Sequence, residues 1–181
     1  MRSDEQIIIQ VIGGDNDAYY ELVQRHQGAV YRLAYRMLNR AEDAEDIVQD
    51  TFVKAYLRLA ECKDRSKFAA WIRRIAVNTC LSRLPKEIPS DNVEIMSDAE
   101  APLDDPVMSE VIRRIERDHV RDIIARLPTD YRVVIILRYE EDFSYKEIAE
   151  ILGEPISRIS VRVHRAKKML AQKLVVTADA V

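Results

Sequence analysis

Apolar residues recur at spacings of three and four over most of this chain, and this helical period constrains the fold more than any other feature. The period also predicts helices over residues 4–12, 18–38, 67–84, 107–127, 130–140, 144–152 and 155–174. It is cleanest between residues 41 and 59, where one stripe must be buried: Ala44, Ile47, Val48, Thr51, Phe52, Ala55, Tyr56 and Leu59. Only 4 Gly and 6 Pro stand in 181 residues, which argues against a turn-rich β fold. The sequence therefore predicts an all-α protein.

Charge and proline divide the chain into parts. The net charge of −3 is the sum of −5 over residues 1–50, +6 over 51–84, −7 over 85–110 and +3 over 111–181. Residues 85–106 hold four prolines and seven acids and show no helical period. We therefore expect two small helical domains, 1–84 and 107–181, joined by an acidic, proline-containing linker over 85–106.

Several classes of protein are disfavoured. An apolar content of 48% argues against global disorder, and without 18 consecutive apolar residues we expect no membrane span. The first residues lack the pattern of a signal peptide. Two cysteines, Cys62 and Cys80, are too few for a disulfide framework or a four-cysteine zinc site. We expect a cytoplasmic protein that is not an enzyme and has no cofactor, metal or small-molecule substrate.

The C-terminal part has the pattern of a helix-turn-helix. Ser144 and Glu147 form a capping box, Gly153 turns the chain, and Pro155 opens a basic helix. One side of that helix carries a stripe predicted to be buried: Ile156, Ile159, Val163, Ala166 and Leu170. The other side carries candidate contacts to duplex DNA: Arg158, Ser160, Arg162, His164, Arg165 and Lys168. The alternative is an amphipathic helix with a solvated basic face.

An acidic face precedes the first basic segment. Asp43, Asp46 and Asp50 follow one another at i, i+3 and i+7, with Gln49 beside them, opposite the apolar stripe. This face is either ordinary solvated surface, with acids that favour the N-terminal end of the helix dipole, or a docking surface for a basic partner. No histidine, nucleophile or phosphate-binding loop joins the carboxylates, so catalysis is not expected.

The helix predicted over 67–84 carries polar groups suited to nucleic acid. Arg74, Asn78 and Ser82 recur at i, i+4 and i+8, where the asparagine can hydrogen-bond a base edge. The basic residues before it can hold a phosphate backbone: Lys63, Arg65 and Lys67. The alternative for Asn78 is a plain surface position, and Trp71 is predicted to lie in the core and not to stack on bases.

Several motifs together resemble bacterial sigma factors, most closely the extracytoplasmic-function (ECF, group 4) type. The matching segments are Asp43-Ala-Glu-Asp-Ile-Val-Gln-Asp-Thr-Phe52, Phe68-Ala-Ala-Trp-Ile-Arg-Arg-Ile-Ala-Val-Asn-Thr79, Leu127-Pro128, Ser144-Tyr-Lys-Glu-Ile-Ala-Glu-Ile-Leu-Gly153 and Val163-His-Arg-Ala166. They cover both predicted domains.

The resemblance implies a sigma-2 and a sigma-4 domain bound to core RNA polymerase. It implies that the acidic face, to which Asp43 belongs, binds the clamp helices of the polymerase. The contacts are assigned to Asp46, Gln49 and Asp50. It implies that Asn78 recognises an unpaired, flipped base of the −10 element. The loop 60–66, which includes Cys62, would form the pocket around that base. The second helix of sigma-4 would enter the major groove at the −35 element. The family is usually held inactive by an anti-sigma factor, often one anchored in the membrane.

The sequence departs from the family pattern in three places, one of which is Pro85-Lys-Glu in place of the basic tail that often ends the −10 helix. Where the family has an aromatic residue and then a glycine in the −10 loop, this chain has Cys62 and Asp64. The recognition helix opens Pro155-Ile-Ser-Arg-Ile-Ser-Val161, with Ser160 at the usual basic position and Val161 next to it among the candidate −35 contacts. Two alternatives stay open: a sigma-like interaction module that does not drive transcription, and a stand-alone helix-turn-helix regulator.

Overall fold

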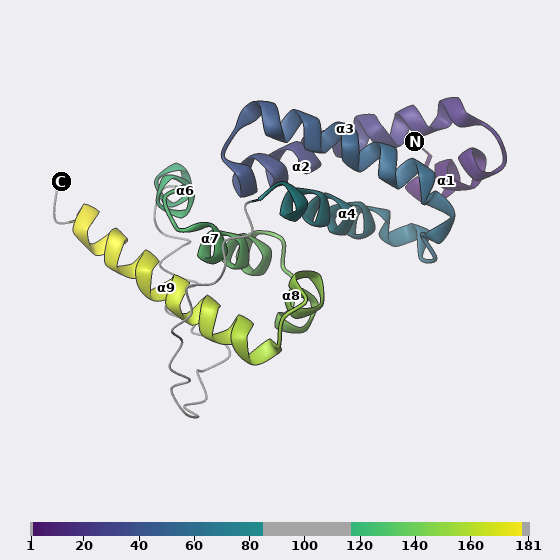
Figure 1. Ribbon diagram of the computed structural model, residues 1–181. Coiled ribbons are helices and arrows are strands. Elements are labelled where there is room, and N and C mark those ends of the chain that lie inside the picture. The colour runs from purple at the N-terminus through teal and green to yellow at the C-terminus, as the bar shows by residue number, and fades with distance from the viewer. Residues whose placement is uncertain (1, 85–116, 179–181) are drawn as a thin grey trace. The chain divides into compact units, whose positions relative to one another are not determined.

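The structure is a computed structural model that describes residues 2–84 and 117–178 (Figure 1). Every regular element in these two stretches is helical, which confirms the all-α prediction. The chain divides into two compact units, residues 1–84 and 85–181, and each is described here by itself. The predicted linker 85–106 and the predicted helix start at residue 107 lie outside the described residues.

The first unit is built on three long helices. They are α2 (Tyr19–Leu38), α3 (Ala41–Leu57) and α4 (Phe68–Arg83), and each packs against the other two (Figure 1). A shorter helix, α1 (Asp4–Ile12), packs on α2. The largest fully buried side chains of this unit come from all four helices and form one core: Ile7, Ile8, Leu22, Leu33, Met37, Ile47, Phe68 and Ile72.

Local sequence signals decide where these helices begin and end. The Ser3 hydroxyl accepts a hydrogen bond from the Gln6 amide at 3.2 Å, and the Gln6 side chain accepts one from the Ser3 amide at 2.9 Å, so a capping box opens α1. Asn39 ends α2 in the left-handed region with φ 57°, which asparagine tolerates better than most residues. The chain can therefore reverse between α2 and α3 within two residues.

The apolar stripe of α3 is buried as predicted at most of its positions. Val48 is half-buried, and Tyr56 is exposed at the rim of the helix. Its hydroxyl lies 2.9 Å from the side-chain oxygen of Asn16, and its ring meets the edge of Tyr19 at 5.0 Å. The Tyr19 hydroxyl in turn donates to the Phe52 carbonyl oxygen at 2.7 Å. The helix also ends two residues before the predicted Leu59, which is buried in a 3-10 turn over Leu59–Glu61.

The second unit places one short helix at its centre. This helix is α7 (Thr129–Ile135), and it packs between α6 (Arg117–Ala125) and α9 (Ile156–Ala178). Residues 132–137 are all buried, which in a helix means that the whole circumference is covered. The predicted helix over 130–140 is present, but its second half, residues 136–140, is a π-helical turn and not α-helix. The Glu141 amide donates to the Ile136 carbonyl at 3.1 Å, five residues back.

The helix-turn-helix consists of α8 (Tyr145–Leu152) and α9, which pack on each other. The Ser144–Glu147 capping box is present, and Gly153 ends α8 in the left-handed region with φ 67°. The predicted stripe of α9 is buried at Ile159, Val163, Ala166 and Leu170. Ile156 is exposed, against the prediction, because a helical side chain covers the turn before its own Cα and the first residue has no such turn.

Candidate functional sites

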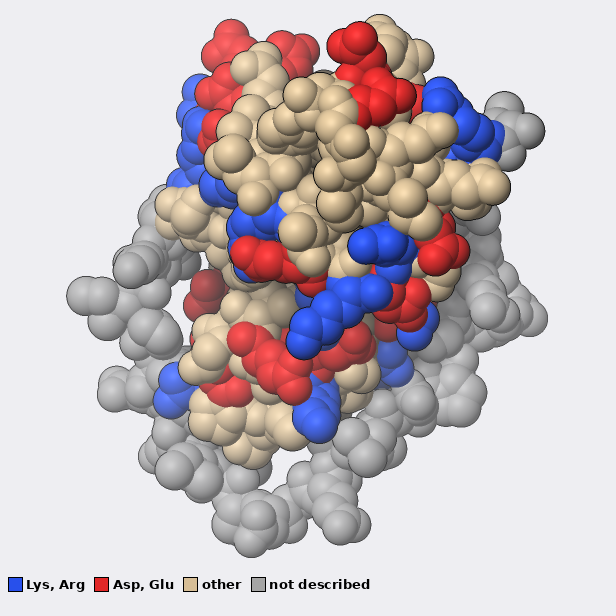
Figure 2. Space-filling view, turned by 90° about the vertical axis from the view of Figure 1, so that its right-hand side faces the viewer, with Lys and Arg blue, Asp and Glu red and all other residues tan. Residues whose placement is uncertain are grey.

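Acidic and basic side chains are interspersed on the face of the molecule shown in Figure 2. No large patch of a single sign stands out on this face. Among residues 2–84 and 117–178, no group of three or more His, Cys, Asp and Glu is arranged to hold a metal ion. Within the same residues, no helix has both the length and the apolar character needed to cross a membrane.

The predicted acidic face lies on the exposed side of α3. The side chains of Asp46 and Asp50 are 58% and 46% exposed, and Gln49 is exposed beside them. Asp43 is half-buried and pairs with Arg40 at 3.3 Å, one helical turn earlier. The helical spacing therefore brings Asp46, Gln49 and Asp50 together on one accessible surface.

A cation from α4 already occupies this acidic face. Arg83 Nη1 lies 3.1 Å from an oxygen of Asp46, and Nη2 lies 3.0 Å from an oxygen of Asp50. Hydrogen bonds to Asp50 and Asp46 raise the pKa of the Arg83 guanidinium above its usual value. The sequence analysis missed this role of Arg83, since the two partners lie 37 and 33 residues away along the chain.

The same face of α3 continues as an apolar surface. Val53 and Leu57 follow Gln49 at i+4 and i+8, and both side chains are exposed. The sequence analysis also missed these residues, although the spacing of 49, 53 and 57 would have placed them on this face. The exposed side of α3 thus offers carboxylates near its first half and apolar side chains near its end.

The loop between α3 and α4 is organised around Asp64. Its carboxylate accepts a hydrogen bond from the Ser66 hydroxyl at 2.5 Å and pairs with the Lys67 ammonium at 3.2 Å. The Cys62 thiol donates to the Asp64 carbonyl oxygen at 3.6 Å. Cys62 is only 3% exposed, and burial raises the pKa of its thiol. Its side chain is therefore turned away from the surface on which DNA was predicted to lie.

The predicted polar face of α4 is accessible to a partner. Arg74 and Asn78 are exposed one helical turn apart, and Lys63 is exposed in the preceding loop. Arg65, also from this loop, is half-buried. Trp71 is neither fully buried nor free, because its half-buried ring lies 5.8 Å from the ring of Phe68. The geometry can present a hydrogen-bonding amide between positive charges to a single strand.

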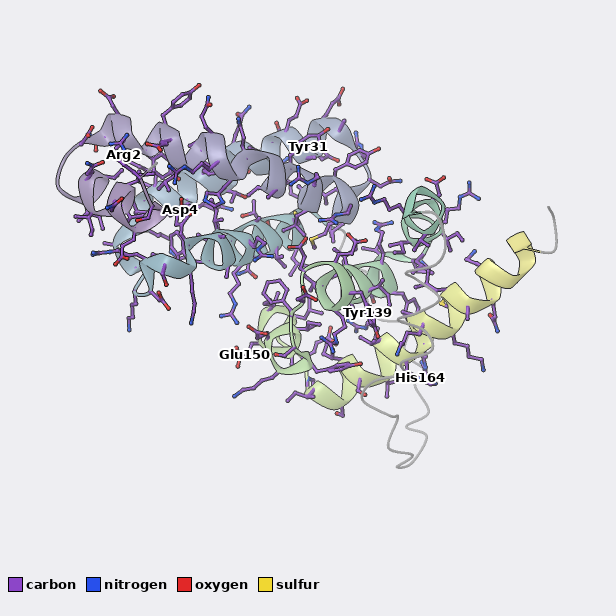
Figure 3. The ribbon with its side chains drawn as sticks, turned by 180° about the vertical axis from the view of Figure 1, so that it is seen from behind. Arg2, Asp4, Tyr31, Tyr139, Glu150 and His164 are labelled. Atoms are coloured by element: carbon purple, nitrogen blue, oxygen red, sulfur yellow. The ribbon has the colours of Figure 1, made fainter. Side chains whose placement is uncertain are left out.

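The outer face of α9 carries most of the predicted duplex contacts. Figure 3 shows His164 on this helix and Glu150 on α8. Four of the candidate side chains are exposed, and two are half-buried. The exposed ones are Arg158, Val161, His164 and Lys168, and the half-buried ones are Ser160 and Arg165. This arrangement fits a recognition helix whose first turns meet base edges.

Arg162 is placed differently from the other candidates. Its Nη1 and Nη2 atoms donate to the two carboxylate oxygens of Glu154 at 3.1 and 2.9 Å. The side chain of Arg162 is only 10% exposed, and that of Glu154 is 21% exposed. Glu154 stands in the turn between α8 and α9, so this arginine reaches back to the turn. The sequence analysis did not identify Glu154 as its partner.

Comparisons of the sequence cover both units. The family model for sigma-70 region 2 matches residues 22–87, and the model for sigma-70 region 4 matches residues 117–170. The ECF RNA polymerase sigma factor SigW of Bacillus subtilis is 33% identical, over 92% of this chain and 94% of that protein. The ECF RNA polymerase sigma-E factor of Haemophilus influenzae is also 33% identical, over 95% of both chains.

Solved structures agree with these relatives. CnrH, solved in complex with the cytosolic domain of CnrY, matches at 26% identity with a TM-score of 0.58, over 97% of this chain and 99% of that chain. The sigma factor RpoE of Bartonella quintana, solved with the anti-sigma factor NepR, matches at 28% identity with a TM-score of 0.59, over 87% and 97%. Because the similarity runs through both units and nearly the full length of each relative, the chain belongs to the ECF RNA polymerase sigma factors of the sigma-70 family.

Proposed function

We propose that this protein binds core RNA polymerase and directs it to promoters, with the first unit at the −10 element and the second at the −35 element. The observation that carries this proposal is the separation of surfaces on one chain. A carboxylate face on α3 suits a basic protein partner, and polar, basic faces on α4 and α9 suit nucleic acid. In this role the protein recognises and positions, acts in the cytoplasm, and catalyses no reaction of its own.

Each surface has a distinct part in the proposal. Asp46, Gln49 and Asp50 contact the polymerase, with Asp43 supporting the start of the face. Asn78 hydrogen-bonds an unpaired base. The nearby groups that hold the strand are Lys63, Arg65, Lys67 and Arg74, while Cys62 contributes only through its backbone. The contacts to duplex come from Arg158, Ser160, Val161, His164, Arg165 and Lys168.

An anti-sigma factor is proposed as a further partner. Two of the similar structures contain a second protein, and RpoE of Bartonella quintana is described as bound to the anti-sigma factor NepR. The exposed mixture of carboxylates and apolar side chains on α3 is accessible to such a protein as well as to polymerase. Competition between the two for this chain would keep the promoter function off.

Run-off transcription with core polymerase tests the proposal. The purified protein, added to core enzyme and fragmented genomic template, is expected to give discrete transcripts whose mapped starts share −10 and −35 sequences. Asn78→Ala should lower open-complex formation by about tenfold, because flipping a base costs a few kcal/mol that the pocket must recover. Gln27→Ala, at an exposed position on α2, is the matched control. Absence of any promoter-dependent transcript would sink the proposal.

A second candidate function follows from the loop at Asp64. Its carboxylate stands where the family has glycine, and Cys62 is buried where the family has an aromatic residue. A chain with this loop could bind polymerase or an anti-sigma factor without melting DNA. Co-purification with polymerase together with a silent transcription assay would identify that function, since co-purification alone is expected of both.

A further inference from the structure

Arg162 faces the turn of the helix-turn-helix and not the outer face of α9. Both terminal nitrogens of its guanidinium are paired with the two oxygens of one carboxylate, at 3.1 and 2.9 Å. This two-point geometry is available to arginine and not to lysine, whose ammonium is a single point charge. With its side chain 10% exposed, Arg162 has little surface left for a phosphate.

The partner carboxylate stands at the structural pivot of the motif. Glu154 lies between Gly153, which turns the chain with φ 67°, and Pro155. The carbonyl oxygen of Pro155 accepts a hydrogen bond from the Arg158 amide at 3.0 Å, in the first turn of α9. The Glu154 amide donates back to the Ala149 carbonyl in α8 at 3.1 Å. The residue is therefore tied to α8 through its backbone and to α9 through its side chain.

The pair also brackets the predicted reading residues. Arg158, Ser160 and Val161 lie in sequence between Glu154 and Arg162, on the first turns of α9. The Arg162–Glu154 pair joins the second helical turn of α9 to the loop that precedes this helix. It therefore fixes the direction of α9, and of the reading residues on it, relative to α8. A base edge is read within a hydrogen-bond length, so a small change in this direction is enough to lose a contact.

We propose that Arg162 is a positioning residue for −35 recognition, which acts through Glu154 to fix the angle of α9 and contacts no phosphate itself. This proposal rests on the proposed promoter function of α9. It removes Arg162 from the set of predicted DNA contacts and adds Glu154, an acid, to the residues that duplex recognition requires.

Two opposite expectations separate positioning from phosphate contact. If Arg162 held a phosphate, Arg162→Lys would keep most of the binding, and Glu154→Gln would leave it unchanged or stronger by removing a negative charge near DNA. If the pair positions α9, both variants lose the fork and weaken −35-dependent binding alike, by about five- to tenfold. The double variant Glu154→Arg with Arg162→Glu, which rebuilds the pair in reverse, is expected to recover most of that loss.

The experiment measures promoter complexes of the reconstituted holoenzyme as a function of salt. A lost phosphate contact lowers the slope of log affinity against log salt by about 0.9. Lys168→Ala, at an exposed position further along α9, should lower this slope, while Arg162→Gln and Glu154→Gln should not. Glu150→Gln is the control, because it makes the same carboxylate-to-amide change on α8 and leaves the Arg162–Glu154 pair in place. Thermal unfolding of each variant gives the fraction of folded protein.

Three results would overturn the proposal. The first is that Arg162→Gln lowers the slope of log affinity against log salt, while Glu154→Gln binds the promoter as tightly as the unmodified protein does. The second is a reversed pair that recovers nothing although it folds. The third is a loss of binding that disappears once it is corrected for unfolded protein. In each case the unmodified holoenzyme still gives promoter-dependent transcripts, whereas failure of the promoter function itself would appear as no transcript from the unmodified protein.

Discussion

At the scale of single residues, burial governs the chemistry of the two thiols. Cys62 and Cys80 are both free and both buried. Burial raises the pKa of Cys80 to about 12 and also raises that of Cys62. Because the thiolate is the reactive form, neither residue is suited to redox chemistry in the folded protein.

The native protein is therefore expected to resist alkylation. At pH 8, iodoacetamide should label Cys80 and Cys62 at least tenfold more slowly than in the urea-unfolded chain, as followed by mass spectrometry. The raised pKa values also predict a sign for stability. The unfolded thiols ionise first, near pH 8.5, so the free energy of unfolding should fall as pH rises above that value. Equal labelling rates in the two states would contradict the buried placement.

Arg83 gives a second prediction at this scale. Its side chain and those of Asp46 and Asp50 are 39%, 58% and 46% exposed, so Arg83→Ala should change the free energy of unfolding little. By uncovering the two carboxylates, the same variant should bind core polymerase a few-fold more tightly in the absence of DNA. Arg58→Ala, which breaks the local pair with Glu61, is the control. Weaker binding would mean that Arg83 itself contacts the polymerase.

At the scale of elements, the capping boxes decide where helices begin. The box at Ser144 opens α8, the helix that supports the recognition helix. Ser144→Ala should lower the free energy of unfolding by about 1 kcal/mol in urea titrations, since it leaves the Glu147 amide without its partner. Ser157→Ala, on the exposed first turn of α9, should change it by less than about 0.5 kcal/mol. Equal effects would show that the box adds nothing.

Most of the helices could be predicted from the local sequence pattern. The helix boundaries at Gly13, Asn39, Pro128 and Gly153 were visible because each residue acts on its own neighbours. The π-helical turn over 136–140 was not visible, since it depends on how a wholly buried helix meets the rest of its unit. Periodicity assigns a face to a side chain but gives no measure of how much of that face a neighbour covers, which is why Tyr56 and Ile156 were misplaced.

The candidate surfaces were only partly predictable for the same reason. The spacing of Asp46, Gln49 and Asp50 predicted that they share one face of α3. The spacing of Arg74 and Asn78 predicted that they share one face of α4. The burial of the Cys62 side chain, in contrast, depends on tertiary packing, which the spacing of residues in the sequence does not predict. So are the partners of Arg83 and Arg162, which lie on other elements.

At the scale of the whole molecule, the net charge of −3 conceals unlike parts. The two basic stretches, 51–84 and 111–181, belong to different compact units, so neither unit alone carries both of them. We expect the free chain to bind a −35 duplex weakly, with Kd values above about 1 μM at 0.15 M salt and strong salt sensitivity. Fluorescence anisotropy measures this, and a scrambled duplex is the control. Tight, specific binding by the free chain would instead favour the stand-alone regulator.

The π-helical turn has a consequence for any exchange of parts between relatives. Its hydrogen bonds span five residues instead of four, so this turn at the end of α7 holds about one residue more than an α-helical turn would. Deleting one residue from 136–140 would allow an ordinary α-helical turn there with little rotation of the following chain, whereas the same deletion within α7 would rotate it by about 100° around the helix axis. A chimera that grafts a foreign helix-turn-helix onto this chain should therefore be joined before residue 136, so that the donor brings its own version of the turn.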